Sequence, residues 1–67
     1  MVDRSPRHLR KLLEDLDILN TELARYCQVS EASVYRWLNG TTQVPAPVIR
    51  MLELMQYVNQ GREKVRV

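Results

Sequence analysis

The side chains that could support nucleophilic, acid–base or metal chemistry are few. Glu14, Asp15 and Asp17 form the densest carboxylate group, but their spacing points them around a helix end, as on a solvated surface. No glycine-rich phosphate loop, no metal-ligand spacing, and no nucleophile with a base and an orienting group is present. We therefore expect no catalytic residue, metal site, cofactor or small-molecule ligand, and we do not expect an enzyme.

The positive charges are unevenly placed along the chain. Arg4, Arg7, Arg10 and Lys11 fall in a short N-terminal stretch whose only acidic side chain is Asp3. The whole chain of 67 residues has a net charge of only +2. The local excess, rather than the total charge, therefore indicates an anionic partner, and Arg7, Arg10 and Lys11 are suited to attract it without sequence preference.

Length and composition bound the class of protein. A chain this short buries roughly 60% of its unfolded surface, which allows one small core, so we expect a single domain over residues 1–67. No apolar run approaches the ~18 residues of a spanning helix, and the N-terminus lacks the apolar segment of a signal peptide. We expect a cytoplasmic protein with no membrane partner. Cys27 has no second cysteine to pair with, so packing and a partner subunit should supply stability.

The first half of the chain predicts two short helices. Ser5 is a suitable N-cap with Pro6 at the first helical position, and an amphipathic stripe predicts a helix over 6–16 with the apolar positions Leu9, Leu12, Leu13 and Leu16. Asn20 or Thr21 should cap a second helix that stops before Val29. Its buried positions would be Leu23, Ala24 and Cys27.

The segment after Ser30 predicts a third helix with two different faces. Ser30 is a suitable N-cap, Glu31 favours the first turn through the helix dipole, and Asn39-Gly40 should end the helix. At roughly 100° per residue, one side, which we assign to the core, holds Val34, Trp37 and Leu38. The opposite side holds Ala32 and Arg36, flanked by Ser33 and Tyr35.

The last third of the chain predicts a loop and a fourth helix. The prolines favour a surface loop over 41–47, followed by a helix over about 48–59 that Gly61 ends. Its inner stripe would be Val48, Met51, Leu52, Met55 and Val58. The tail 62–67 alternates polar and apolar residues, so it could fray or form a short strand ordered by a partner. The expected class is all-α, a small four-helix domain.

Residues 20–38 have the layout of a helix-turn-helix, in which a small residue lets two short helices approach closely. Ala24 is that small residue, and Val29, Val34 and Trp37 would fix the crossing angle. The run is similar to the helix-turn-helix of the Cro and phage-repressor class (XRE-like). The matching positions, within a resemblance that extends from Leu9 to Val58, are Leu23-Ala24, Val29-Ser30, Val34, Trp37 and Gly40.

One position departs from the family pattern. The family usually has glycine directly before the valine of the turn, where the backbone tends to be left-handed, and this chain has Gln28. A non-glycine residue holds that conformation at a cost of ~1–2 kcal/mol. The small size, the basic start and the proline-containing segment also resemble the anti-CRISPR-associated repressors, small phage proteins that shut off the operon encoding them.

The resemblance implies how the chain would contact double-stranded DNA. Family members place the third helix in the major groove. In this chain, the residues that this placement would bring to the bases or their nearest phosphates are Glu31, Ala32, Tyr35 and Arg36. Arginine can bond guanine bidentately, glutamate can accept from cytosine, and a methyl group can contact thymine. His8 would lie at the surface near the DNA backbone. The positions suited to the DNA backbone are Arg7, Arg10, Lys11, Asn20, Thr21, Ser33, Asn39, Thr41, Thr42 and Gln43.

Two functions from different classes remain open at this point. The favoured one is a dimeric repressor, in a bacterial or phage-infected cell, that binds an inverted repeat. Its two-fold interface would lie on helix four, with the 65–67 tail as an extension, through Met51, Leu54, Met55 and Val58. An activator would differ mainly in where its site lies. The alternative is a helical protein-interaction module such as an antitoxin or adaptor, but such a module would usually present larger apolar anchors than Ala32, Ser33 and Arg36.

Overall fold

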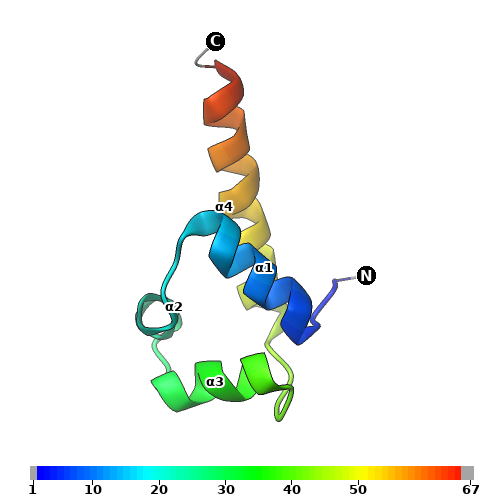
Figure 1. The fold of residues 1–67 in the computed structure, drawn as a ribbon, viewed down its shortest axis with the longest axis vertical. Helices are drawn as coiled ribbons and strands as arrows, with labels where there is room; N and C mark the ends of the chain where they lie inside the picture. The colour runs from blue at the N-terminus through cyan, green and yellow to red at the C-terminus, as the bar shows by residue number, and fades with distance from the viewer. Residues whose placement is uncertain (1, 66–67) are drawn as a thin grey trace.

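The computed structural model describes the backbone of residues 2–65 and the side chains of residues 2–59. Within this part the protein is all-α, with four helices and no strand, as the sequence predicts. The helices are α1 (Pro6–Leu16), α2 (Asn20–Cys27), α3 (Glu31–Asn39) and α4 (Ala46–Val65). Figure 1 shows α3 at one end of the molecule and the C-terminal half of α4 projecting beyond α1 at the other.

The bounds of α1 and α3 follow the capping residues in the sequence. The Ser5 hydroxyl accepts a hydrogen bond from the His8 amide, and the Ser30 hydroxyl accepts one from the Ser33 amide, so both predicted N-caps are confirmed. Helix α3 ends as predicted at Gly40, whose φ of 81° is left-handed. Helix α1 ends at Asp17, which also takes a left-handed conformation, with φ of 56°.

The start of α2 differs from the sequence prediction. Asn20 is already the first helical residue, so neither Asn20 nor Thr21 is the cap. The cap is Leu19, whose backbone amide donates to Glu22 Oε1 at 2.9 Å. This bond occupies an amide that would otherwise lack a protein partner, so a residue without a polar side chain can begin the helix.

Helix α4 is longer at both ends than the sequence predicts. It begins at Ala46, because Pro47 lies in the first turn, where an amide has no intrahelical acceptor to lose. The prediction that Gly61 ends the helix is wrong, and so is a strand over 62–65, since α4 continues to Val65. Glycine costs a helix only ~1 kcal/mol, and the good helix formers after it extend the helix. Residues 66–67 of the predicted tail lie outside the described part.

The core lies where α1, α2, α3 and the first turns of α4 meet. Its buried side chains are Leu9, Leu12, Leu13, Leu23, Ala24, Val34, Trp37, Val44, Ile49 and Leu52. Val44 and Ile49 were not among the predicted core positions. The predicted inner stripe of α4 is wrong at its last two positions, because Met55 and Val58 are exposed. Val29, expected to pack, is 36% exposed, and Cys27 is only partly buried.

Three polar contacts link distant parts of the chain around this core. Arg4 Nε donates to the Val44 carbonyl oxygen at 2.8 Å. His8 Nε2 lies 2.9 Å from Glu53 Oε2, and Gln56 Nε2 donates to Asp15 Oδ2, also at 2.9 Å. The last two contacts join α1 to α4, and the first joins the N-terminal segment to the loop before α4. They fix the direction in which α4 leaves the body of the molecule.

Candidate nucleic-acid interface

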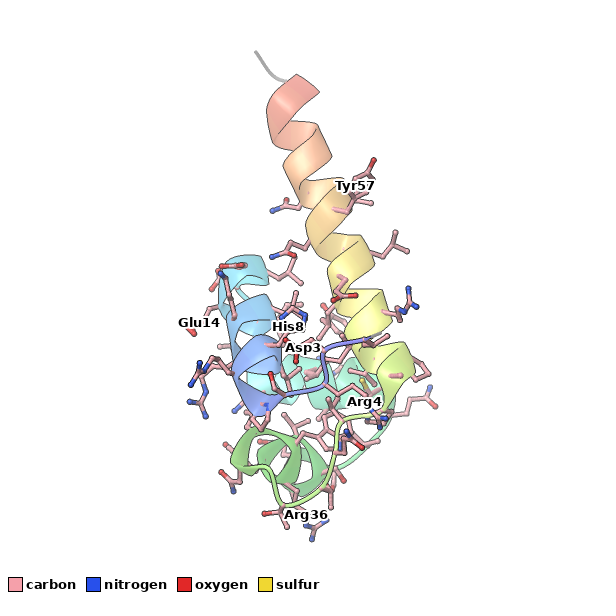
Figure 2. All side chains as sticks on the ribbon, turned by 90° about the vertical axis from the view of Figure 1, so that its right-hand side faces the viewer. Asp3, Arg4, His8, Glu14, Arg36 and Tyr57 are labelled. Carbon is pink, nitrogen blue, oxygen red and sulfur yellow. The ribbon has the colours of Figure 1, made fainter. Side chains whose placement is uncertain are left out.

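Helix α3 separates a packed face from an exposed face. Val34 is fully buried and Trp37 is 7% exposed, so both side chains belong to the core as predicted. The expected base-contacting residues Glu31, Ala32, Tyr35 and Arg36 are all exposed. Figure 2 shows Arg36 at the end of the molecule away from Tyr57 on the projecting part of α4. The interior contacts of Val34 and Trp37 therefore hold the helix while its polar face stays accessible.

The turn between α2 and α3 sets the position of this exposed face. Gln28 is left-handed, with φ of 57° and ψ of 45°, as the family pattern predicts for this position. The amide of Val29 then donates to the Ala24 carbonyl oxygen at 3.0 Å, which closes the end of α2. Ala24 is buried, and its small side chain allows α2 and α3 to pack closely. The turn brings Ser30 into place to cap α3.

These features decide the family of the chain. A family model for the Cro/C1-type helix-turn-helix DNA-binding domain matches residues 8–59. The chain belongs to this family. Comparisons with curated proteins and with solved structures give no match. The protein is therefore a helix-turn-helix DNA-binding regulator of transcription. Members of this family are typically not enzymes.

The helix-turn-helix has a groove beside its exposed face. The groove has a volume of about 460 Å³ and lies among α1, the start of α2 and the C-terminal half of α3. It brings together four of the predicted DNA-contacting side chains, namely Arg10, Asn20, Tyr35 and Asn39. Glu14 and Asp17 also line it. A phosphate in this groove would be favoured near the cation and the amides, and repelled by the two carboxylates.

The segment after α3 starts tightly against the helix. The Arg36 carbonyl oxygen accepts from the amides of Thr41 at 2.9 Å and Thr42 at 3.3 Å. The side chains of Thr41, Thr42 and Gln43 are exposed. These bonds occupy a carbonyl at the helix end and leave the three polar side chains free to face a ligand. The loop predicted to contact the DNA backbone thus lies directly beside the C-terminal end of the helix-turn-helix unit.

The remaining residues predicted to contact the DNA backbone differ in whether other protein groups already bind them. Arg7, Arg10 and Lys11 on α1 are exposed, and none makes an ion pair among the side chains of residues 2–59. Thr21 is exposed at the start of α2. Ser33 is only partly exposed, and its hydroxyl oxygen lies 3.2 Å from that of Ser30. Ser33 therefore already takes part in capping α3, whereas the three α1 cations have no such contact with another described side chain.

His8 does not have the surface position predicted for it. Its side chain is partly buried and contacts Glu53 on α4. Sequence reasoning gave no partner for His8 because Glu53 lies 45 residues further along the chain. The imidazole therefore has a structural contact with α4, and we do not assign it to the DNA backbone.

Two titratable groups have shifted pKa values with clear causes. Hydrogen bonding from the Ser5 amide lowers the pKa of Asp3, which keeps this exposed carboxylate ionised. Partial burial raises the pKa of the Cys27 thiol, so Cys27 stays protonated near neutral pH. Over the described residues, no three of the side chains His, Cys, Asp and Glu gather as metal ligands would.

The middle of α4 carries a second exposed surface. Leu54 is 63% exposed and Val58 50%, and Met55 is also exposed, whereas Met51 packs partly against the core. The exposed side chains line a groove of about 540 Å³ together with Leu16, Ile18 and Tyr26. Tyr57, which the sequence prediction left out, is also exposed here. None of the described helices has the length and apolar character needed to cross a bilayer.

Proposed function

We propose that the protein is a dimeric repressor that reads an inverted-repeat operator through the exposed face of α3. The observation that carries this proposal is the position of Arg36, exposed on α3 while Val34 and Trp37 hold the helix to the core. Arg36 would bond a guanine bidentately, Glu31 would accept from a cytosine amino group, and Ala32 would contact a thymine methyl group. Tyr35 would contact a base or the nearest phosphate.

Polar and cationic groups around α3 would hold the domain on the duplex without reading its sequence. Salt-dependent attraction would come from Arg7, Arg10 and Lys11, which have no ion-pair partner among the described side chains. The start of α2 and the segment after α3 would add neutral hydrogen bonds to phosphates. The proposed neutral contacts are Asn20, Thr21, Ser33, Asn39, Thr41, Thr42 and Gln43.

The dimer would form through α4. An isolated small domain rarely leaves Leu54, Met55 and Val58 exposed on one projecting helix, and apolar surface of this kind usually marks an interface. Met51 is partly buried against the core and precedes Leu54 and Met55 by three and four residues, which places it on the same side of α4, so it would join the interface. A two-fold dimer would place two copies of α3 on half-sites about one helical turn apart, ~34 Å.

The regulated gene would be the one that encodes the protein itself. The small size, the basic start and the proline-containing segment before α4 resemble anti-CRISPR-associated repressors, which shut off their own operon. The DNA upstream of the protein's own gene is therefore the sequence to test first.

A gel-shift titration tests the proposal. The upstream duplex and a shuffled duplex of the same composition are titrated at one stated salt concentration near ~0.15 M, where the Debye length is about 8 Å. We expect the upstream duplex to bind roughly a thousandfold more tightly, the lower end of the usual specific-to-nonspecific ratio. Equal affinity for the two duplexes would exclude self-regulation, and no binding to either would favour a protein-interaction module.

A further inference from the structure

Arg4 is held in place before any ligand binds. Its Nε donates to the Val44 carbonyl oxygen at 2.8 Å, across 40 residues of sequence, and its side chain is partly buried. Val44 itself is buried in the core. Figure 2 shows Arg4 beside the segment that leads into α4. The guanidinium is therefore bonded to the backbone of a core residue, unlike the exposed cations of α1.

A polar concavity lies beside this fixed guanidinium. It has a volume of about 380 Å³ and lies between the N-terminal segment and the end of α3. Its lining includes Arg4 together with the polar residues Ser5, Thr42 and Gln43. Trp37 and Gly40 form the side toward α3. No carboxylate of residues 2–59 lines it, in contrast to the groove that Glu14 and Asp17 share with Arg10.

We propose that this concavity binds one phosphodiester group of the DNA backbone, with Arg4 as its cation. An arginine side chain has five N–H donors, and only the Nε bond to Val44 is present among the described residues. The amino groups at Nη are thus available for a phosphate oxygen, and Thr42 and Gln43 can donate to the same group. This site rests on the proposed DNA-binding function and adds a residue to it.

The place of the concavity fits the path of a DNA backbone. A helix in the major groove lies between two phosphate strands, so residues just beyond its end are the ones that reach a strand. Thr42 is such a residue, since its amide bonds the carbonyl oxygen of Arg36. A guanidinium that is already ordered loses less conformational entropy when it binds than a mobile one. Arg4 should therefore contribute more per charge than Arg7.

The only carboxylate next to Arg4 in sequence does not compete for it. Asp3 Oδ1 accepts from the Ser5 amide at 3.0 Å, and no ion pair joins Asp3 and Arg4 in the described structure. Asp3 is exposed, so its charge is screened by solvent. The guanidinium thus keeps its full charge for an anion.

The test measures coupling between Arg4 and single phosphates. The starting probe is a duplex that the wild-type protein selects from random-sequence DNA. From it a series of duplexes is made, in each of which one phosphate is replaced by a neutral methylphosphonate. For wild-type protein we expect one such phosphate, beside the half-site, to cost roughly five- to tenfold in affinity. For Arg4→Gln the same replacement should cost nothing further, and the slope of log affinity against log salt should fall by about 0.9.

Matched variants separate contact from folding. Arg50→Gln removes an exposed cation of α4 outside the concavity and should leave the phosphate penalties and the salt slope unchanged. Arg4→Lys keeps the charge and should retain most of the salt slope, even if losing the Val44 bond lowers the melting temperature. An unchanged penalty at every phosphate in Arg4→Gln would overturn this inference while leaving the proposed function intact. A wild-type protein that selects no duplex would overturn both.

Discussion

Gln28 holds a left-handed backbone conformation, with φ of 57° in the turn between α2 and α3. A non-glycine residue in this conformation destabilises the folded state by ~1–2 kcal/mol, and glycine removes this strain. Glycine also makes the unfolded chain more flexible, which offsets part of the gain in stability. We expect Gln28→Gly to raise the free energy of unfolding by about 1 kcal/mol net. For a domain of this size the melting temperature should then rise by roughly 4–8 °C, measured by circular dichroism.

The matched control for this variant is Gln43→Gly. Gln43 is an exposed glutamine in a loop, and its φ is not positive. Glycine there only adds freedom to the unfolded chain, so the melting temperature should fall or stay unchanged. If Gln28→Gly lowered the melting temperature as much as Gln43→Gly does, the turn would not be strained.

Single residues also show where sequence reasoning stops. The caps Ser5 and Ser30 and the exposure of Arg36 were predictable because each depends on residues within one or two helical turns. The left-handed position of Gln28 was predictable only from the resemblance to the family pattern. The partners of Arg4 and His8 were not predictable, because Val44 and Glu53 lie 40 and 45 residues away in sequence. The excess of positive charge near the N-terminus was visible, but only the fold distinguishes the held Arg4 from the free Arg7.

The packing of α2 against α3 depends on the size of one side chain. Ala24 is buried in the core and lies on α2, which packs against α3, so we expect a larger residue to push the two helices apart. We expect Ala24→Leu to lower the free energy of unfolding by ~1–3 kcal/mol. DNA binding should weaken along with stability, because the orientation of α3 changes. Thermal melting and a gel shift on the same preparation measure both effects.

An exposed alanine of α3 provides the comparison. Ala32→Leu places the same side chain on the face opposite the core, so the melting temperature should stay within a few degrees of wild type. DNA affinity should fall, since Ala32 is proposed to contact a base. Equal losses of stability in both variants would contradict the assignment of buried and exposed faces.

At the level of elements, prediction succeeded where local signals were strong. Helices α1 and α3 have polar caps, a clear apolar stripe and a definite end, so their bounds were correct to the residue. Helix α4 lacks a strong end signal, because Gly61 weakens a helix without stopping it. Val44 and Ile49 were missed in the core because the loop and the start of α4 were predicted from proline positions rather than from packing.

The whole molecule has α3 at one end and the projecting half of α4 at the other (Figure 1). We expect dimers in sedimentation at tens of micromolar, formed through α4. Leu54→Arg should yield monomers with an unchanged helical signal, because Leu54 is 63% exposed and makes little contribution to the core. Leu19→Arg alters an equally exposed leucine at the start of α2 and should remain dimeric. Wild-type protein that stays monomeric both free and with DNA would contradict this interface.

The same arrangement restricts the orientation of such a dimer. One duplex can bind both copies of α3 only if the two recognition helices lie at the same end of the assembly. The two α4 helices should therefore pack with their C-terminal ends together rather than in opposite directions. In a background of Cys27→Ser, Met51→Cys and Val58→Cys variants should then each form a disulfide with their own copy, because parallel helices place equal positions side by side. If only a mixture of the Met51→Cys and Val58→Cys proteins formed a disulfide, between the two variants, the helices would be antiparallel.

Recognition of DNA through the exposed face of α3 is tested most directly by Arg36→Ala. The variant should keep the melting temperature and helical signal of the wild type, because Arg36 is exposed while Val34 and Trp37 hold the helix. Loss of a bidentate arginine–guanine contact costs ~1–3 kcal/mol of discrimination, so operator affinity measured by gel shift should fall roughly tenfold to a hundredfold, and one guanine position should become tolerant of substitution. A folded Arg36→Ala protein that binds the operator as tightly and as selectively as wild type would contradict the account.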